Sequence, residues 1–81
     1  MYYVYILLCS NGSLYTGISN NPQRRFIEHI NGQGGCYTRS HKPVKIVYLE
    51  KYSSKSKALK REAEIKSWER KKKIRVLKLK I

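Results

Sequence analysis

Residues 2–19, YYVYILLCSNGSLYTGIS, decide the fold of this chain. Tyr2 to Cys9 is rich in aromatic and β-branched side chains, a composition typical of a buried strand. Asn11-Gly12 follows it at once and is a strong signal for a two-residue hairpin turn, because both positions accept positive φ. Ser13 to Ser19 then forms the returning strand. The start of the chain is therefore predicted to be a β-hairpin.

A helix is predicted directly after the hairpin. Asn21, a residue type common at N-caps, and the proline after it indicate a helix over residues 22–31, which Gly32 ends. Arg25 and His29 lie four residues apart, on a stripe next to the one that faces the core. These two side chains should therefore point in a similar direction.

The remaining residues predict a third strand and a second helix. Residues 32–42 contain three glycines and form a loop, and residues 44–52 form a strand that pairs antiparallel in the same sheet. Serines at 53, 54 and 56 offer N-caps for a helix to about Arg70. Residues 71–81 close the chain as a short basic helix or tail. No repeat or linker divides it.

Length and composition limit the possible classes. Eighty-one residues make one domain with a single core, so we expect one unit over residues 1–81. The longest apolar run, residues 4–9, is too short to span a bilayer, and the first residues lack the basic start of a secretory signal. Cys9 and Cys36 lack metal-ligand or disulfide spacing, which indicates reduced thiols in a cytoplasmic protein.

Positive charge is the strongest compositional feature. Lys and Arg number 18 against five Asp and Glu, a net charge of +13. Residues 1–38 hold two arginines and one glutamate, a net of +1, whereas residues 39–81 hold sixteen bases and four glutamates, a net of +12. A field of one sign suits a polyanion, so nucleic acid is the expected partner. A membrane-surface helix, disfavoured by the lack of a clean apolar face, and a solvated face without a partner remain alternatives.

Several basic and histidine side chains are candidates for contacts to the nucleic-acid backbone. Such contacts position a protein on its substrate and carry no base sequence. We expect neither a membrane partner nor an obligate protein partner. The candidates are Arg24, Arg39, His41, Lys42, Lys71, Lys72 and Lys73.

Carboxylates are scarce, which shortens the search for acid–base and metal chemistry. The chain has no Asp and five Glu. Ala58 and Ile65 place Glu62 on the apolar stripe of its helix. An inward carboxylate is unfavourable unless a cation or hydrogen bonds compensate it, and spacing alone favours a structural salt bridge to Arg25 or a lysine. Taken alone, Tyr5 is likewise more typical of a core and His29 of a structural histidine.

The chain resembles the GIY-YIG nuclease superfamily, in particular its small stand-alone bacterial members. Tyr3-Val4-Tyr5 and Tyr15-Thr16-Gly17 look like its paired signature, and residues 21–29 resemble its first helix. Each motif is weak alone, but their order and spacing are specific, and the match covers almost the whole chain. The further matching segments are residues 35–39, 48–50, 58–62 and 66–68.

The resemblance implies a fold and an activity. The fold would be α+β, with a three-stranded antiparallel sheet flanked by helices and the site on one face of the sheet. Its order would be strand, strand, helix, strand, helix, with a short C-terminal helix. The activity would be metal-dependent endonucleolytic hydrolysis of phosphodiester bonds in nucleic acid, in DNA repair or processing.

The resemblance also implies roles for five residues. Tyr15 would act near the attacking water as a general base, and Tyr5 would position water or phosphate. Arg25 would neutralise charge on the phosphoryl oxygens, and His29 occupies a catalytic position whose role varies among relatives. Glu62 would hold a single divalent metal, Mg²⁺ or Mn²⁺. A hard cation that keeps most of its waters needs few protein ligands, so one glutamate suffices.

Three positions depart from the family pattern. Tyr3 stands where the first motif has glycine, Thr16 where the second has isoleucine, and Cys36 where stand-alone members often carry lysine. The last change removes one phosphate contact from the loop.

Two other functions stay open: a nucleic-acid-binding module that hydrolyses nothing, and an assembly protein that docks on RNA or on an acidic partner.

Overall fold

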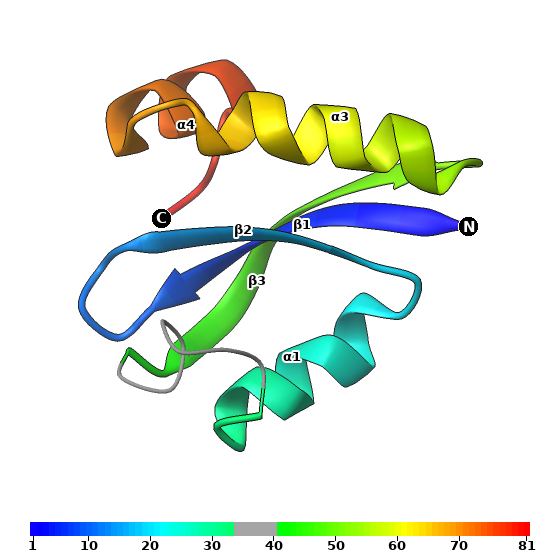
Figure 1. Cartoon of the computed structure of the whole chain (residues 1–81). Coiled ribbons are helices and arrows are strands. Elements are labelled where there is room, and N and C mark those ends of the chain that lie inside the picture. The colour runs from blue at the N-terminus through cyan, green and yellow to red at the C-terminus, as the bar shows by residue number, and fades with distance from the viewer. Residues whose placement is uncertain (34–40) are drawn as a thin grey trace.

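The computed structural model describes residues 1–33 and 41–81. These residues form a three-stranded antiparallel sheet and three helices, which confirms the predicted fold class (Figure 1). The elements in chain order are β1 (Tyr2–Cys9), β2 (Leu14–Ser19), α1 (Pro22–Ile30), β3 (Pro43–Tyr52), α3 (Lys55–Lys66) and α4 (Arg70–Leu77).

The sheet has β1 at its centre, in the order β2-β1-β3. Helices α3 and α4 cover one face, and α1 lies against the other (Figure 1). Successive side chains of a strand point to opposite faces. Val4 and Ile6 of β1 therefore pack in one buried cluster with Ala58 and Ile65 of α3, while Tyr5 points toward α1. The face covered by α3 and α4 contains the apolar core, and the face toward α1 carries the hydroxyl of Tyr5.

The hairpin loop differs from the predicted two-residue turn. The Cys9 N–H donates to the Ser13 carbonyl and the Gly12 N–H to the Cys9 carbonyl, each at 2.9 Å, so residues 10–12 form a three-residue loop. Within it only Gly12 has positive φ, at 84°. Asn11 Oδ1 accepts hydrogen bonds from the Ser13 backbone N–H and hydroxyl, and this side-chain turn favours the longer loop. The Asn-Gly pair located the turn but not its type.

The start and end of α1 follow the predicted capping. Asn21 Oδ1 accepts from the Arg24 N–H at 3.1 Å, and proline occupies the first turn. At the other end Gly32 adopts a φ of 78° and its N–H donates to the His29 carbonyl. A left-handed residue is needed there, and glycine provides it without steric conflict.

The second helix is shorter than the sequence predicts. Helix α3 begins after Ser54, whose Oγ accepts from the Lys57 N–H, but it ends at Lys66 rather than near Arg70. The Ser67 hydroxyl donates to the Glu64 carbonyl at 2.6 Å, so this carbonyl of the last helical turn has a side-chain donor. Trp68 then packs against the apolar cluster, and α4 starts as a separate helix.

The predictions about membrane spans and about the two cysteines can be compared with the described residues only. No helix formed by the described residues is long and apolar enough to cross a membrane. Cys9 is a buried free thiol, and burial raises its pKa. Cys36 lies outside the described residues.

Candidate active site

Pairing of β1 with β2 brings two signature tyrosines to the α1 face of the sheet. Tyr5 lies opposite Gly17, and Leu7 lies opposite Tyr15. The Tyr5 and Tyr15 ring centroids are 6.4 Å apart. Tyr5 is fully buried, whereas Tyr15 is half-buried. The two hydroxyls therefore share one face but differ in their access to water.

Gly17 allows the Tyr5 side chain to cross β2. A Cβ atom at this position would lie 2.5 Å from the Tyr5 hydroxyl oxygen and 2.7 Å from Tyr5 Cζ. Both distances are shorter than real Cβ contacts, so only glycine leaves room for the ring. Gly17 is part of the second signature motif, and this close packing is the physical reason for a glycine there.

His29 of α1 completes a cluster with the two tyrosines. Its Nε2 lies 2.9 Å from the Tyr5 hydroxyl oxygen, and its ring centroid lies 5.0 Å from that of Tyr15 in an edge-on contact. The imidazole is fully buried. Burial, and after it the positive charge of Arg25, lowers the pKa of His29, so the imidazole is neutral at neutral pH.

The Tyr5 hydroxyl is held in its neutral form. Burial is the main cause that raises its pKa to about 12, and the charges of Tyr15 and Glu62 act in the same direction. The Arg25 guanidinium opposes them and lowers the pKa. Tyr5 can therefore donate or orient a hydrogen bond at neutral pH, but it cannot serve as a base.

Arg25 lies one helical turn before His29 and is shared between Tyr5 and a carboxylate. Its Nη1 lies 3.0 Å from Glu28 Oε1, and its charge acts on the Tyr5 hydroxyl. The Arg24 Nε lies 3.6 Å from the other Glu28 oxygen. Glu28 thus holds both arginines at the rim of the cluster.

Glu62 lies on α3, which covers the opposite face of the sheet from α1 (Figure 1). Its side chain is 17% exposed and pairs with Lys66, one turn further along, at 3.4 Å. Its charge also raises the pKa of the Tyr5 hydroxyl, as the weakest of the causes that act on that group. Arg61, which precedes Glu62 in the sequence, is bound to Glu50 at 2.9 Å and to Glu64 at 2.6 Å.

The ion pair between Glu62 and Lys66 is weak enough for a divalent cation to replace it. Lys66 is half-exposed, at 51%, and pairs of this kind on a helix contribute only about 0.3–0.5 kcal/mol. The described residues contain no cluster of three or more His, Cys, Asp or Glu that could enclose a metal. A lone carboxylate fits a hydrated Mg²⁺ or Mn²⁺, which keeps most of its water ligands, and does not fit a closed structural metal site.

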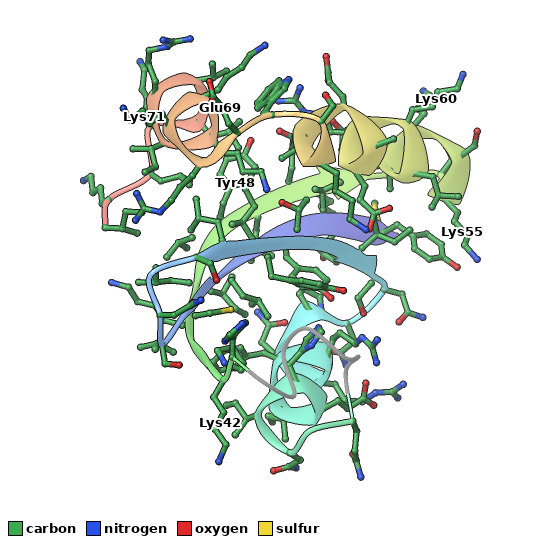
Figure 2. All side chains as sticks on the ribbon, turned by 60° about the vertical axis from the view of Figure 1, so that its left-hand side comes forward. Lys42, Tyr48, Lys55, Lys60, Glu69 and Lys71 are labelled. Carbon is green, nitrogen blue, oxygen red and sulfur yellow. The ribbon has the colours of Figure 1, made fainter. Side chains whose placement is uncertain are left out.

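The predicted nucleic-acid contacts fall in different places. Lys71 and Lys72 are exposed on α4, with the Lys72 ammonium 5.1 Å from the Trp68 ring centroid. Lys42 is exposed at the start of β3, next to half-buried His41. Figure 2 shows Lys42 and Lys71 at opposite ends of the molecule. Arg24 is exposed on α1, with a side chain 74% accessible.

Lys73 differs from its exposed neighbours on α4. Lys73 is buried, and its ammonium donates to Thr16 Oγ1 at 3.0 Å across the α4–β2 contact. Lys73 is therefore poorly placed for the predicted contact with nucleic acid, because a helix presents only some of its consecutive lysines to solvent. Arg39 lies outside the described residues.

Comparisons with known proteins place the chain among small bacterial relatives. The model of the GIY-YIG catalytic domain matches residues 1–75. A UPF0213 protein of Staphylococcus aureus is 51% identical over 77 residues, which cover 95% of this chain and 94% of the relative. A UPF0213 protein of Staphylococcus saprophyticus is 49% identical over 76 residues, which cover 94% of this chain and 93% of the relative.

Solved structures with the same fold exist for two similar proteins, both determined by solution NMR. The UPF0213 protein of Bacillus halodurans is 39% identical, with a TM-score of 0.61 over 96% of this chain and 84% of that one. A protein from E. faecalis is 40% identical, with a TM-score of 0.65 over 95% and 82%. The similarity therefore extends over nearly the whole chain.

Proposed function

This chain belongs to the GIY-YIG family, and from this premise we propose that it is a metal-dependent endonuclease that hydrolyses phosphodiester bonds in nucleic acid, with DNA favoured. The observation that carries the proposal is the cluster of Tyr5, Tyr15 and His29, with Arg25 beside it and Glu62 within electrostatic range. Hydroxyls, a neutral imidazole, a guanidinium and a carboxylate together supply the groups that phosphodiester hydrolysis requires.

The two tyrosines divide the proton chemistry. Tyr5 is buried, bonded to His29 and neutral, so its role is to orient water or a phosphoryl oxygen. Tyr15 is half-buried, with its ring centroid 5.0 Å from that of the neutral His29, so its hydroxyl can meet an attacking water. A general base must reach the proton that it removes, and of these two hydroxyls Tyr15 has the access.

Arg25 stabilises negative charge as it grows on the phosphoryl oxygens. Its guanidinium already acts on the Tyr5 hydroxyl, so a phosphate next to that hydroxyl would come within its reach. A preorganised cation of this kind lowers the barrier because it needs no rearrangement during the reaction. Glu28 sets its starting position through the 3.0 Å ion pair.

Glu62 is the residue that would hold the metal. A divalent cation bound there would polarise the phosphoryl group and stabilise the leaving oxygen. Lys66 neutralises the carboxylate in the free protein and would have to release it for a cation. Basic side chains would hold the rest of the substrate by its phosphates, in the cytoplasm and without a partner protein. They are the exposed Arg24, Lys42, Lys71 and Lys72 and the half-buried His41, with Arg39 as a further candidate from the sequence.

The test compares the wild type with Tyr15→Phe and Glu62→Gln on single-stranded, nicked and duplex DNA and on RNA, with Mg²⁺ or Mn²⁺. We expect cleavage by the wild type and losses of about 100-fold or more in both variants, the scale of a lost general base or metal ligand. Affinity for the oligonucleotide and the melting temperature without metal should stay near those of the wild type. The Tyr15→Phe ring still packs, and the Glu62→Gln change leaves the basic surface intact.

Thermal melts with and without Mg²⁺ separate this proposal from its rivals. A cation that binds only the folded state raises the wild-type melting temperature through mass action, and Glu62→Gln should remove this increase. A wild type that ignores Mg²⁺ and a Glu62→Gln variant that is strongly destabilised would show Glu62 to be structural. Binding without cleavage on every substrate would favour a non-catalytic binding module.

A further inference from the structure

A cleft of about 390 Å³ opens beside Arg25, outside the tyrosine cluster. It lies where β2 leads into α1 and where α3 begins, and these segments meet at the side of the molecule marked N in Figure 1. Its volume is within the range of roughly 300–1,000 Å³ that is common for small-molecule sites. The polar residues that line it are Ser19, Asn20, Arg24, Arg25, Glu28 and Lys55.

The charges around this cleft suit an anion. Three cationic side chains, Arg24, Arg25 and Lys55, face one carboxylate, so the net charge of the lining is +2. Glu28 pairs with both arginines and holds them at the rim. Among the described residues no carboxylate pairs with Lys55, whose ammonium lies 5.9 Å from the Tyr2 ring centroid.

The cleft is built on fixed backbone. Ser19 Oγ accepts from the Asn21 N–H at 3.0 Å, and Asn21 Oδ1 accepts from the Arg24 N–H at 3.1 Å. These bonds hold the turn between β2 and α1 before any ligand arrives. A preformed site loses less conformational entropy on binding than a mobile one.

The position of the cleft relates it to the proposed reaction. The Tyr5 hydroxyl lies over Gly17, and Ser19 follows two residues later on β2, about 7 Å further along the strand. Arg25 belongs to both places, since it acts on Tyr5 and lines the cleft. A phosphate in the cleft would therefore be a neighbour of the phosphate at the tyrosines, on the same polynucleotide strand.

We propose that this cleft is a second phosphate subsite, which binds the phosphodiester next to the scissile one through Arg24 and Lys55. The strand then leaves the site along the edge of β2 toward the beginning of α3. This inference rests on the proposed nuclease function for the identity of the substrate. The subsite contacts the phosphate backbone and not the bases. It therefore determines which phosphodiester bond lies at the tyrosines but gives no preference for a base sequence.

A matched pair of lysine variants tests the subsite. Lys55→Gln and Lys60→Gln each remove one positive charge from exposed positions on α3, but in Figure 2 Lys60 points away from the sheet. We expect Lys55→Gln to weaken binding of a 12-nucleotide DNA strand about tenfold and to lower the salt slope by about one. The Lys60→Gln change should alter affinity less than twofold. Melting temperatures confirm that both variants fold.

Amide NMR with inorganic phosphate provides a readout that needs no cleavage. Phosphate titrated into the wild type should shift the Ser19 and Asn20 amides, and Lys55→Gln should abolish these shifts while Lys60→Gln retains them. Shifts at Ser19 and Asn20 in a protein that cleaves nothing would support the subsite and reject the nuclease. Cleavage with equal effects of the two lysine variants, or phosphate shifts confined to α4, would overturn the subsite and leave the nuclease intact.

Discussion

At the scale of single residues, Tyr5 and Tyr15 carry the same side chain in different surroundings. Tyr5 is buried over Gly17 and bonded to His29, and its pKa is about 12. Tyr15 remains half-buried, with its ring in a T-shaped contact with that of His29. In the proposed reaction the first hydroxyl orients and the second reacts. Burial, rather than residue type, separates the two roles.

Gly17→Ala tests this arrangement. The new Cβ would meet Tyr5 Oη and Cζ at 2.5 and 2.7 Å, so the buried ring must move and its bond to His29 must break. Overpacking of this kind costs about 1–3 kcal/mol, and cleavage should fall with it because Tyr5 loses its position. Chemical denaturation gives the stability, and the His29 ring signals in NMR report the broken bond.

Gly12→Ala is the matched control. Gly12 also has a special backbone, with φ at 84°, but its Cβ would meet no heavy atom within 4 Å. The substitution should therefore destabilise the hairpin through backbone strain, by about 1 kcal/mol, and leave the His29 signals unchanged. Unchanged His29 signals in Gly17→Ala as well would contradict the close packing of Tyr5 against Gly17.

At the scale of secondary-structure elements, α4 divides its basic residues between two tasks. Lys73 and Arg70 face the hairpin, where the Lys73 ammonium donates to Thr16 Oγ1 and Arg70 Nε donates to the Gly12 carbonyl at 2.8 Å. Lys71 and Lys72 face solvent. Burial, and after it the charge of Lys66, lowers the pKa of Lys73. The same helix therefore docks through one side and offers charge on the other.

Methionine at these positions should separate docking from binding. Lys73→Met keeps the apolar stem and removes a buried charge, so stability should change by less than about 1 kcal/mol and nucleic-acid affinity should persist. Lys71→Met should weaken affinity and leave stability unchanged, because its ammonium is exposed. Thr16→Val, which leaves the Lys73 ammonium without its acceptor, should cost about 1–3 kcal/mol. Equal losses of affinity in Lys73→Met and Lys71→Met would refute this division.

At the scale of the whole molecule, pH acts on a strongly cationic fold that contains a neutral buried histidine. The folded state lowers the pKa of His29 from its ordinary 6.5, first through burial and then through Arg25. Below pH 6.5 the His29 side chain binds a proton in the unfolded chain, whereas in the folded chain it stays neutral until the pH reaches its lower pKa. Stability should therefore fall as pH drops from about 6.5 toward the lower folded pKa, and it should be fully retained above that window.

Denaturation of the wild type and His29→Gln between pH 5 and pH 7.5 measures this effect. The variant should lose most of the slope in this interval. The carboxylate of Glu50 contributes only at lower pH: burial raises its pKa, but hydrogen bonds from Tyr48, Tyr52 and Arg61 outweigh burial and lower it. Its stabilising contribution is therefore lost in more acidic solution, below about pH 4. The same slope in both proteins would show that another group causes the change.

Sequence patterns were sufficient for the elements because their causes are local. Alternation of side chains, the Asn21 cap and the Gly32 terminus each depend on a few neighbouring residues, and the strands and α1 lie where these signals put them. The errors occurred where a local signal competes with packing. The hairpin took a longer loop through the Asn11 side chain, and α3 ended early as Ser67 closed it and Trp68 packed inward.

The sequence by itself determined the order of the elements, the family and the charge of the second half, because composition, periodicity and motif order are properties of the linear chain. Only the tertiary structure decided which tyrosine is buried, which carboxylate Arg61 binds and which lysine of α4 is buried. These outcomes depend on contacts between residues far apart in the chain. The Lys73 ammonium meets Thr16 across 57 positions, and no local pattern records such a contact.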